Sequence, residues 1–216
     1  MSIAFFDFDG TLIVRDSGVI CAVPSIKRGL LSPGIGARLI GTYLLSKLGL
    51  RTRTDAQRVG FECYGGRSLE ELREIMQGLH DEHLRRFISA PARERVTAHR
   101  AAGEHLVVLT ASAFFFAEPI CAELGIDELV GTQVGFVDGL CTGTVEGSIL
   151  DGAAKLAAAT RCAAARNVSL DDCTFYTDHI ADLPLLLAVG KPVVVGSSAP
   201  LVRLARERDW QVIAHA

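Results

Sequence analysis

The feature that most constrains the fold is an apolar run near the N-terminus that stops at two carboxylates. Residues 3–6 (Ile-Ala-Phe-Phe) are followed by Asp7 and Asp9, and then by Gly10 and Thr11. An unbroken apolar run is typical of a strand buried on both faces of a parallel sheet. Ligands of such sheets bind beyond the carboxyl ends of the strands, and carboxylates there are costly unless something neutralises them. We therefore interpret Asp7 and Asp9 as site residues, although Asp, Gly and Thr are also ordinary turn residues.

Later apolar runs alternate with helical segments and extend the sheet. They predict strands at residues 106–109, 129–132, 173–176 and 192–195. A helix over residues 113–124 is expected to stop at Gly125. Asp138-Gly139, between residues 134–137 and 140–145, is typical of a two-residue hairpin turn. The pattern predicts an α/β fold, a Rossmann-like doubly wound parallel sheet with a small β-hairpin.

Residues 13 to about 90 interrupt this alternation and are predicted to be nearly all helical. Ser32-Pro33 is a helix start, and residues 68–71 form a capping box. Six apolar residues recur at helical spacing: Ile35, Leu39, Ile40, Tyr43, Leu44 and Leu48. We interpret this stripe as packing in a core or in self-association. A membrane-surface helix stays open because basic residues lie nearby: Arg38, Lys47, Arg51 and Arg53.

The composition limits the partners. Of 216 residues, 49% are hydrophobic and 22% charged, which is typical of a globular protein with a sizeable core. A net charge of −3 gives no indication of nucleic acid as a partner. We expect neither a signal peptide nor stable membrane insertion. Six scattered cysteines without a CxxC pair predict reduced thiols in a cytoplasmic protein. His80 and His83 lack a further ligand, so a solvated helix face is preferred to a zinc site.

Further polar residues are expected at the same edge of the sheet as Asp7 and Asp9. Thr110 and Asp178 end predicted strands, Asp182 lies four residues after Asp178, and Lys155 lies in a predicted helix. A helix beginning at Asp178 would place both acids on one face. Taken singly, Thr110 and Ser112 could cap the next helix, and Lys155 could lie on a solvated surface. The four acids would exceed the charge of Lys155 and one divalent cation, which should raise one carboxyl pKa. Oxygen ligands favour Mg²⁺ over zinc.

The segment Asp7-Phe8-Asp9-Gly10-Thr11-Leu12 resembles the first motif of the haloacid dehalogenase (HAD)-like superfamily in its phosphatase form. Other residues match the later motifs in the right order: Thr110, Lys155, and Asp178 with Asp182. Residues 142–145, 176–178 and 182–186 resemble subfamily IB, which contains the phosphoserine phosphatases. The resemblance implies a catalytic core of residues 1–14 and 91–216, with residues 15–90 inserted as a helical cap.

The resemblance also implies roles for the acids. Asp7 attacks phosphorus and becomes an aspartyl phosphate, and Asp9 protonates the leaving alkoxide and later deprotonates water. Mg²⁺ is held by Asp7, by the backbone carbonyl of Asp9 and by Asp178. Asp182 orients a metal-bound water.

Phosphate and substrate contacts are implied in the same way. Thr110 and the backbone N–H of Ala111 bind phosphoryl oxygens, and Lys155 adds positive charge. Asp16 stands where phosphoserine phosphatases place an acid for the substrate ammonium, and it could equally be a helix N-terminal acid.

The implied function is a Mg²⁺-dependent phosphomonoester phosphatase for a small, phosphoserine-like metabolite. A phosphotransferase and a lipid-phosphate phosphatase are the alternatives, whereas retention of every catalytic residue type argues against a non-enzymatic phosphate sensor. The expected partner is the small-molecule substrate, and a homodimer stays open. The substrate is left open by three departures from the relatives: Thr177, His179 and Gly196-Ser197-Ser198.

Overall fold

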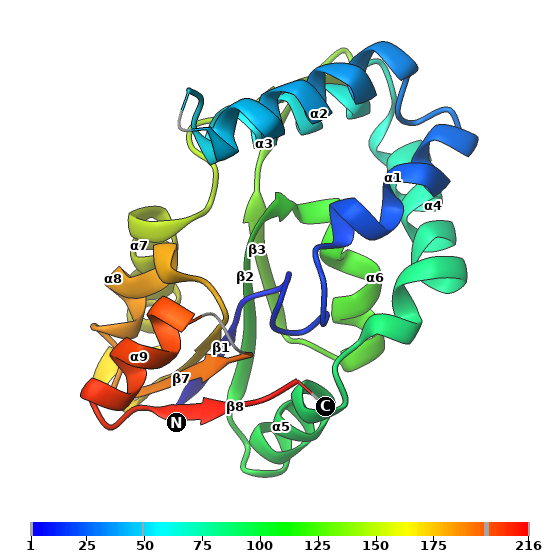
Figure 1. The fold of residues 1–216 in the computed structure, drawn as a ribbon. Coiled ribbons are helices and arrows are strands. Elements are labelled where there is room, and N and C mark those ends of the chain that lie inside the picture. The colour runs from blue at the N-terminus through cyan, green and yellow to red at the C-terminus, as the bar shows by residue number, and fades with distance from the viewer. Residues whose placement is uncertain (1, 49, 197–198, 216) are drawn as a thin grey trace.

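The structure is a computed structural model that describes residues 2–48, 50–196 and 199–215. Within these ranges a parallel sheet has the strand order β3-β2-β1-β6-β7-β8 (Figure 1). Its strands are β1 (Ile3–Phe6), β2 (His105–Ala113), β3 (Glu128–Thr132), β6 (Thr174–Thr177), β7 (Lys191–Val195) and β8 (Gln211–Ile213). The central strand is β1, where Phe5 pairs in register with Val107 of β2 and Phe175 of β6. The predicted doubly wound parallel sheet is confirmed, and the edge strand β8 is an element that the sequence reading missed.

Helices cover both faces of the sheet because successive residues of β1 point to opposite sides. Ala4 and Phe6 belong to a cluster shared with α5 and α6, whereas Ile3 and Phe5 pack with α7, α8 and α9. The bounds are α5 (Ala90–Ala101), α6 (Phe114–Leu124), α7 (Gly152–Ala164), α8 (Leu183–Leu186) and α9 (Ala199–Glu207). As predicted, α6 ends at Gly125, whose φ of 65° is left-handed.

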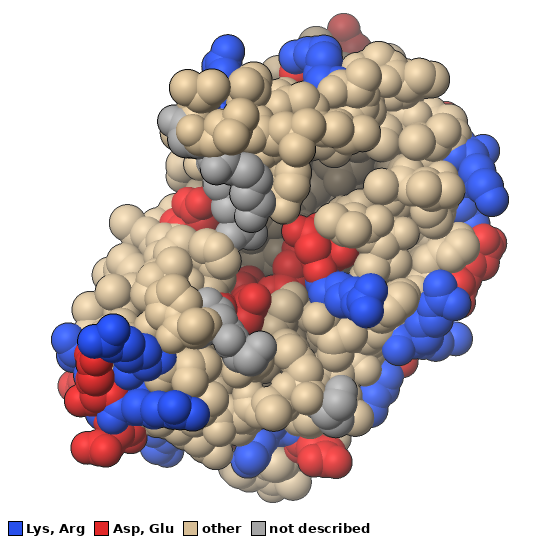
Figure 2. Space-filling model, in the orientation of Figure 1, with Lys and Arg blue, Asp and Glu red and all other residues tan. Residues whose placement is uncertain are grey.

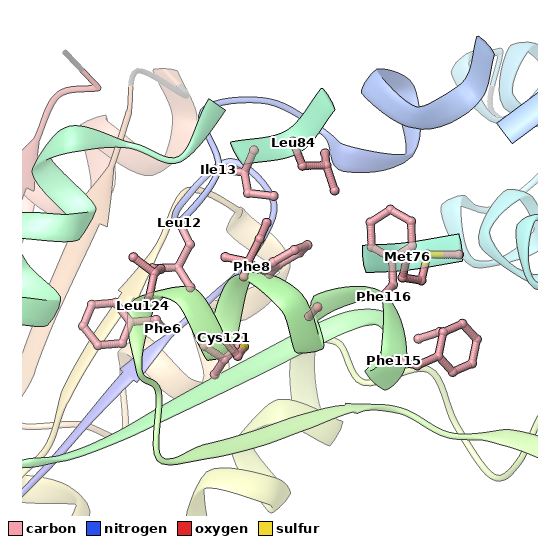
Figure 3. Close-up of a cluster of buried hydrophobic side chains, with 14 of the residues drawn as sticks. Phe6, Phe8, Leu12, Ile13, Met76, Leu84, Phe115, Phe116, Cys121 and Leu124 are labelled. Atoms are coloured by element: carbon pink, nitrogen blue, oxygen red, sulfur yellow. The ribbon is translucent and has the colours of Figure 1, made fainter. Parts of the chain in front are cut away.

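The larger apolar cluster continues beyond β1 into the segment that carries Asp9. Figure 3 shows Phe8 and Ile13 of this segment beside Phe116 of α6, with Met76 and Leu84 from the inserted helical segment. All five side chains are buried. Removing a buried side chain of this size costs roughly 2–5 kcal/mol, so the packing fixes the backbone on both sides of Asp9.

The inserted segment contains the helices α1 to α4, of which α2 and α3 lie beyond the carboxyl ends of the strands and α4 lies beside α6 (Figure 1). Their bounds are α1 (Ser17–Lys27), α2 (Pro33–Lys47), α3 (Arg53–Phe61) and α4 (Leu69–Leu79). The predicted cap at Ser32 and the predicted capping box between Ser68 and Glu71 are both present. The predicted helical cap is therefore confirmed, while its limits at residues 15 and 90 remain a prediction.

Four of the six residues in the apolar stripe of α2 do not pack into a core, which corrects the prediction for them, whereas Ile35 and Leu39 are partly buried. Ile40, Tyr43, Leu44 and Leu48 are all more than half exposed. Helical spacing shows that these residues share a face, but it does not show what covers that face. Of the nearby basic residues, the side chains of Lys47 and Arg53 lie outside what the structure describes. No helix in the described ranges is long and apolar enough to cross a bilayer.

The predicted hairpin is formed by β4 (Val134–Val137) and β5 (Leu140–Val145), and it reaches the cap. Asp138 and Gly139 both have positive φ, as a two-residue hairpin turn requires. The backbone N–H of Gly66 donates to the carbonyl of Cys141 at 2.8 Å, and Cys141 N–H donates to Arg67 at 2.8 Å. These backbone hydrogen bonds therefore connect the hairpin to the inserted helical segment.

The prediction of a solvated face at His80 is wrong. The ring of His80 is buried, and its Nε2 lies 2.7 Å from the carboxylate of Glu123 on α6. The same carboxylate accepts hydrogen bonds from Arg85 and Arg93 at 2.9 and 2.8 Å. His80 therefore helps to hold the end of α4 against the core, a contact between residues 43 positions apart.

Candidate active site

A buried ion pair forms where β1 and β6 end. The ammonium of Lys155, from α7, lies 2.6 Å from Asp7 Oδ1 and 2.8 Å from Asp182 Oδ2. The hydroxyl of Thr177 donates to Asp182 at 2.7 Å and lies 3.4 Å from Asp7 Oδ2. All four side chains are buried. The alternative of a solvated Lys155 is therefore wrong.

Charge explains why Lys155 tolerates burial. Burial acts to lower the pKa of Lys155, but the charges of Asp7 and Asp182 outweigh it, and the pKa is raised. The pKa of Asp7 is raised as well, because burial acts to raise it more than the ammonium of Lys155 acts to lower it. The cation thus stays charged beside a carboxylate that it helps to ionise.

The carboxylate of Asp9 is held from two sides. Oδ1 accepts from the backbone N–H of Ser17, at the start of α1, at 2.7 Å. Oδ2 accepts from the hydroxyl of Ser112, at the end of β2, at 3.1 Å. Burial, with a contribution from Asp16, raises the pKa of Asp9 to about 6. A carboxyl poised near neutrality can act as both acid and base.

Thr110 and Ala111 lie in the same stretch of β2. The Thr110 hydroxyl accepts from Ser112 N–H at 3.0 Å, and the carbonyl of Ala111 accepts from Thr132 at 2.8 Å. The residue before α6 is Ala113, which makes no side-chain cap. The alternative that Thr110 and Ser112 cap this helix is therefore wrong, and Ser112 contacts Asp9 instead.

Asp178 follows β6 and lies against Gly10. A Cβ on Gly10 would come 2.1 Å from Asp178 Oδ2, and Gly10 has a φ of +72°, so only glycine fits there. Burial raises the pKa of Asp178 to about 7, and the charge of Asp7 adds to the shift. The predicted helix from Asp178 to Asp182 is wrong, because His179 caps a short 3-10 turn, Ile180–Asp182, before α8.

Asp16 lies near Asp9, because its charge contributes to the raised pKa of Asp9. Its side chain is exposed and accepts from Val19 N–H at 3.0 Å, which makes it the N-cap of α1. The capping role is therefore present, while a contact with substrate remains a prediction. Figure 2 shows acidic side chains lining the hollow between the helical layer and the sheet domain.

Two site residues, Thr177 and Ser112, make contacts that were not predicted from the sequence. Thr177 bridges Asp7 and Asp182, and the hydroxyl of Ser112 donates to Asp9 from the end of the neighbouring strand β2. The only sequence signal was that both follow apolar strands. The structure brings together the predicted Asp7, Asp182 and Lys155 through direct contacts.

A family model for haloacid dehalogenase-like hydrolases matches residues 4–187, which spans every residue of this cluster. The chain belongs to this family. Within the family it is 31% identical to a phosphoserine phosphatase of Mycobacterium tuberculosis, over 97% of this chain and 69% of that protein. It is 30% identical to a histidinol-phosphatase of Neisseria meningitidis serogroup C, over 98% of both chains. The HAD chain described here is a phosphoric monoester hydrolase of the phosphoserine phosphatase-like type.

A solved structure has the same fold. The crystal structure of a protein of unknown function from Bordetella pertussis Tohama I superposes with a TM-score of 0.87 and 29% identity, covering 98% of this chain and 97% of that one. The sheet and the inserted helical cap are therefore shared along the full described length of this HAD phosphatase.

Proposed function

We propose that this HAD phosphatase cleaves small phosphomonoesters through a covalent aspartyl phosphate on Asp7. The observation that carries the proposal is the buried contact of 2.6 Å between Asp7 Oδ1 and Lys155 Nζ. A carboxylate nucleophile must be ionised, and a buried cation favours that form. Asp7 forms the bond to phosphorus as the bond to the leaving alkoxide breaks.

Asp9 carries the proton in both half-reactions. Its carboxyl, with a pKa of about 6, donates a proton to the leaving oxygen and then accepts one from the attacking water. The contacts from Ser17 and Ser112 fix the carboxyl in one orientation. We assign Thr110 and the N–H of Ala111 to the phosphoryl oxygens, and Lys155 to their charge.

Asp182 positions Lys155 in this proposal. It accepts from both Lys155 and Thr177, so it aims the ammonium at Asp7. The role first predicted for Asp182, orienting a metal-bound water, is compatible with these contacts and stays a prediction.

The donor set fits Mg²⁺. Asp7, the backbone carbonyl of Asp9 and Asp178 are hard oxygen donors. Burial raises the pKa of both carboxyls, and a bound cation would offset the cost of burying their charges. No group of three His, Cys, Asp or Glu side chains in the described part of the chain could hold a metal. Two carboxylates, one carbonyl and waters are the kind of set that Mg²⁺ accepts. When bound, the ion would supply positive charge to the phosphoryl oxygens.

For the substrate we propose a phosphorylated amino alcohol. Phosphoserine and histidinol phosphate, named for two relatives, both carry an amine on the carbon next to the phosphate-bearing CH₂ group. Asp16 offers an exposed carboxylate near Asp9, since its charge contributes to the pKa of Asp9. A lipid phosphate is the second candidate, because the exposed apolar stripe on α2 would suit an acyl chain. We also propose a cytoplasmic location. Transfer of the phosphoryl group to an acceptor alcohol instead of water is the alternative reaction.

One experiment tests the metal and the substrate together. We expect EDTA to abolish release of phosphate, Mg²⁺ to restore it and zinc to restore little. With Mg²⁺ present, phosphoserine, histidinol phosphate, lysophosphatidic acid and p-nitrophenyl phosphate are compared by kcat/KM. Full activity after EDTA would refute the metal proposal, and a clear preference for the lipid would refute the amino-alcohol proposal.

A further inference from the structure

His215 reaches back from beyond β8 to the loop that carries the two acids of the first motif. Its Nε2 lies 2.7 Å from the backbone carbonyl oxygen of Gly10, a contact between residues 205 positions apart. A carbonyl only accepts, so Nε2 must carry the hydrogen. The other ring nitrogen, Nδ1, is buried and has no hydrogen-bond partner among the described residues. The contact with Gly10 is therefore the polar bond that fixes this ring.

The ring is also held by packing. A Cβ on Gly196, at the end of β7, would come 3.3 Å from the Cδ2 and Nε2 atoms of His215. The N–H of Gly196 donates to the carbonyl of Ile213 at 2.8 Å, which ties the chain after β8 to the end of β7. His215 thus sits in a place defined by the sheet edge.

Gly10 is confined from its other side by Asp178. A side chain on Gly10 would overlap the Asp178 carboxylate. The φ of +72° is open to glycine because glycine has no Cβ, and the same freedom makes its backbone less restricted than that of other residues. Packing of Phe8 and Ile13 and the bonds from Ser17 and Ser112 hold the Asp9 residue itself, but none of these contacts reaches the carbonyl of the glycine that follows it. The described contact that holds the Gly10 carbonyl comes from His215.

We propose that His215 is a positioning residue for catalysis. By donating to the Gly10 carbonyl it fixes the peptide after Asp9, and so keeps the carboxyl aligned between Ser17 and Ser112 and at a constant distance from Asp178. The inference rests on the proposed role of Asp9 as acid and base. It assigns to His215 neither contact with substrate nor proton transfer.

The test compares three substitutions that differ in where they place a donor. In His215→Gln the amide nitrogen can occupy the place of Nε2, whereas in His215→Asn it falls near Nδ1, and His215→Ala has no donor. A net hydrogen bond of about 1 kcal/mol predicts a loss of roughly fivefold in kcat for phosphoserine in the Ala and Asn variants. KM should stay within about twofold, and the Gln variant should recover most of the rate. His105→Ala is the matched control. His105 is also a half-buried histidine, but it lies at the N-terminal end of β2, opposite to the end that carries Thr110 and Ser112, and it pairs with Asp127 and Glu128.

Two results would overturn the proposal. Full kcat in His215→Ala would show that the contact has no influence on catalysis, and equal losses in the Ala, Asn and Gln variants would show that only ring packing matters. A readout that needs no activity is the ¹⁵N spectrum of the ring in wild-type protein, in which Nε2 should carry the hydrogen. A ring protonated only at Nδ1 would contradict the contact itself. If wild-type protein hydrolysed no phosphomonoester, the proposed function would fail and this spectrum would still decide the contact.

Discussion

The two sides of the candidate active site are built differently. The floor is the cluster of buried polar side chains at the ends of β1 and β6, and the roof is the layer of cap helices with the adjoining hairpin. On the floor, Asp7, Lys155, Asp182 and Thr177 are buried and contact one another over 2.6 to 3.4 Å. On the roof, helix α2 exposes its apolar stripe, and the hairpin of β4 and β5 braces the neighbouring segment through backbone bonds. In the proposed function, the fixed charge pattern of the floor serves the phosphoryl group that all substrates share. In the proposed function, the exposed side chains of the roof suit the part of the site that distinguishes one leaving group from another.

Within the cap, helix α4 differs from helices α2 and α3 in how it contacts the core. Helix α4 buries Leu72, Met76 and Leu79 against the core, and the carboxylate of Glu123 anchors its C-terminal end. Helices α2 and α3 pack chiefly on each other, and α3 also packs on β5. Helix α4 is therefore held to the core more directly than α2 and α3 are.

The largest effect should come from the floor. Asp7→Asn replaces the nucleophile by a neutral amide, so kcat should fall by about 10⁴-fold or more for every phosphomonoester. Acid quenching should trap no phosphoenzyme, and beryllium fluoride should not bind at the site. Asp81→Asn is the control, since Asp81 is an exposed carboxylate that pairs with Arg85 at 3.3 Å. A hydroxylamine-labile phosphoenzyme in Asp7→Asn would move the nucleophile to Asp9.

The next largest effect should separate the two half-reactions. Asp9→Asn keeps an acceptor for the Ser17 N–H but removes the transferable proton, which is worth about 10²–10⁴-fold. p-Nitrophenolate leaves without protonation, so this substrate should give a burst of nitrophenol followed by a slow steady state, because no base activates water. An alkyl phosphate should give no burst. Equal bursts with both substrates, or none with either, would argue against the two-step role of Asp9.

Anchoring of α4 predicts a smaller effect, on stability. Glu123→Gln should lower the free energy of unfolding by about 1–3 kcal/mol, because His80, Arg85 and Arg93 would lose the charge that they share. Urea denaturation measures the change. Glu118→Gln is the control, since Glu118 pairs with the exposed Arg73 at 2.7 Å and such pairs contribute less than about 1 kcal/mol.

The same contact predicts a pH dependence. Burial acts to raise the pKa of Glu123, but hydrogen bonds from Arg93, Arg85 and His80 lower it to about 2. A lowered carboxyl pKa stabilises the fold above the unfolded value, about 4.5, and the stabilisation is lost as pH falls from there to about 2. Glu123→Gln should lack this part of the acid-induced loss, and a variant with an unchanged acid profile would contradict the role of Glu123.

Sequence reasoning was most successful where the signal is local. The apolar run before Asp7 identified both the strand and the acids, because a buried strand must end where charges begin. It failed where one residue's environment is set by a distant one. Burial of His80 depends on Glu123, and the contact of His215 with Gly10 spans almost the whole chain. The stripe on α2 shows a third limit, because periodicity identifies a face without identifying its partner.

The smallest predicted effect lies at Asp16, which caps α1 and whose charge acts on the pKa of Asp9. Asp16→Ala removes cap and charge, whereas Asp16→Asn removes the charge alone, because asparagine caps helices as well as aspartate does. If the carboxylate binds the substrate amine, both variants should raise KM for phosphoserine by roughly threefold to fivefold, as expected for an exposed ion pair of up to about 1 kcal/mol. KM for p-nitrophenyl phosphate, which lacks an amine, should change in neither variant. An Asn variant that matches wild type on both substrates would assign Asp16 to capping only, and equal losses on both would place its effect on Asp9 through α1. Either outcome would move the selectivity of the roof away from α1 and towards α2 and α3.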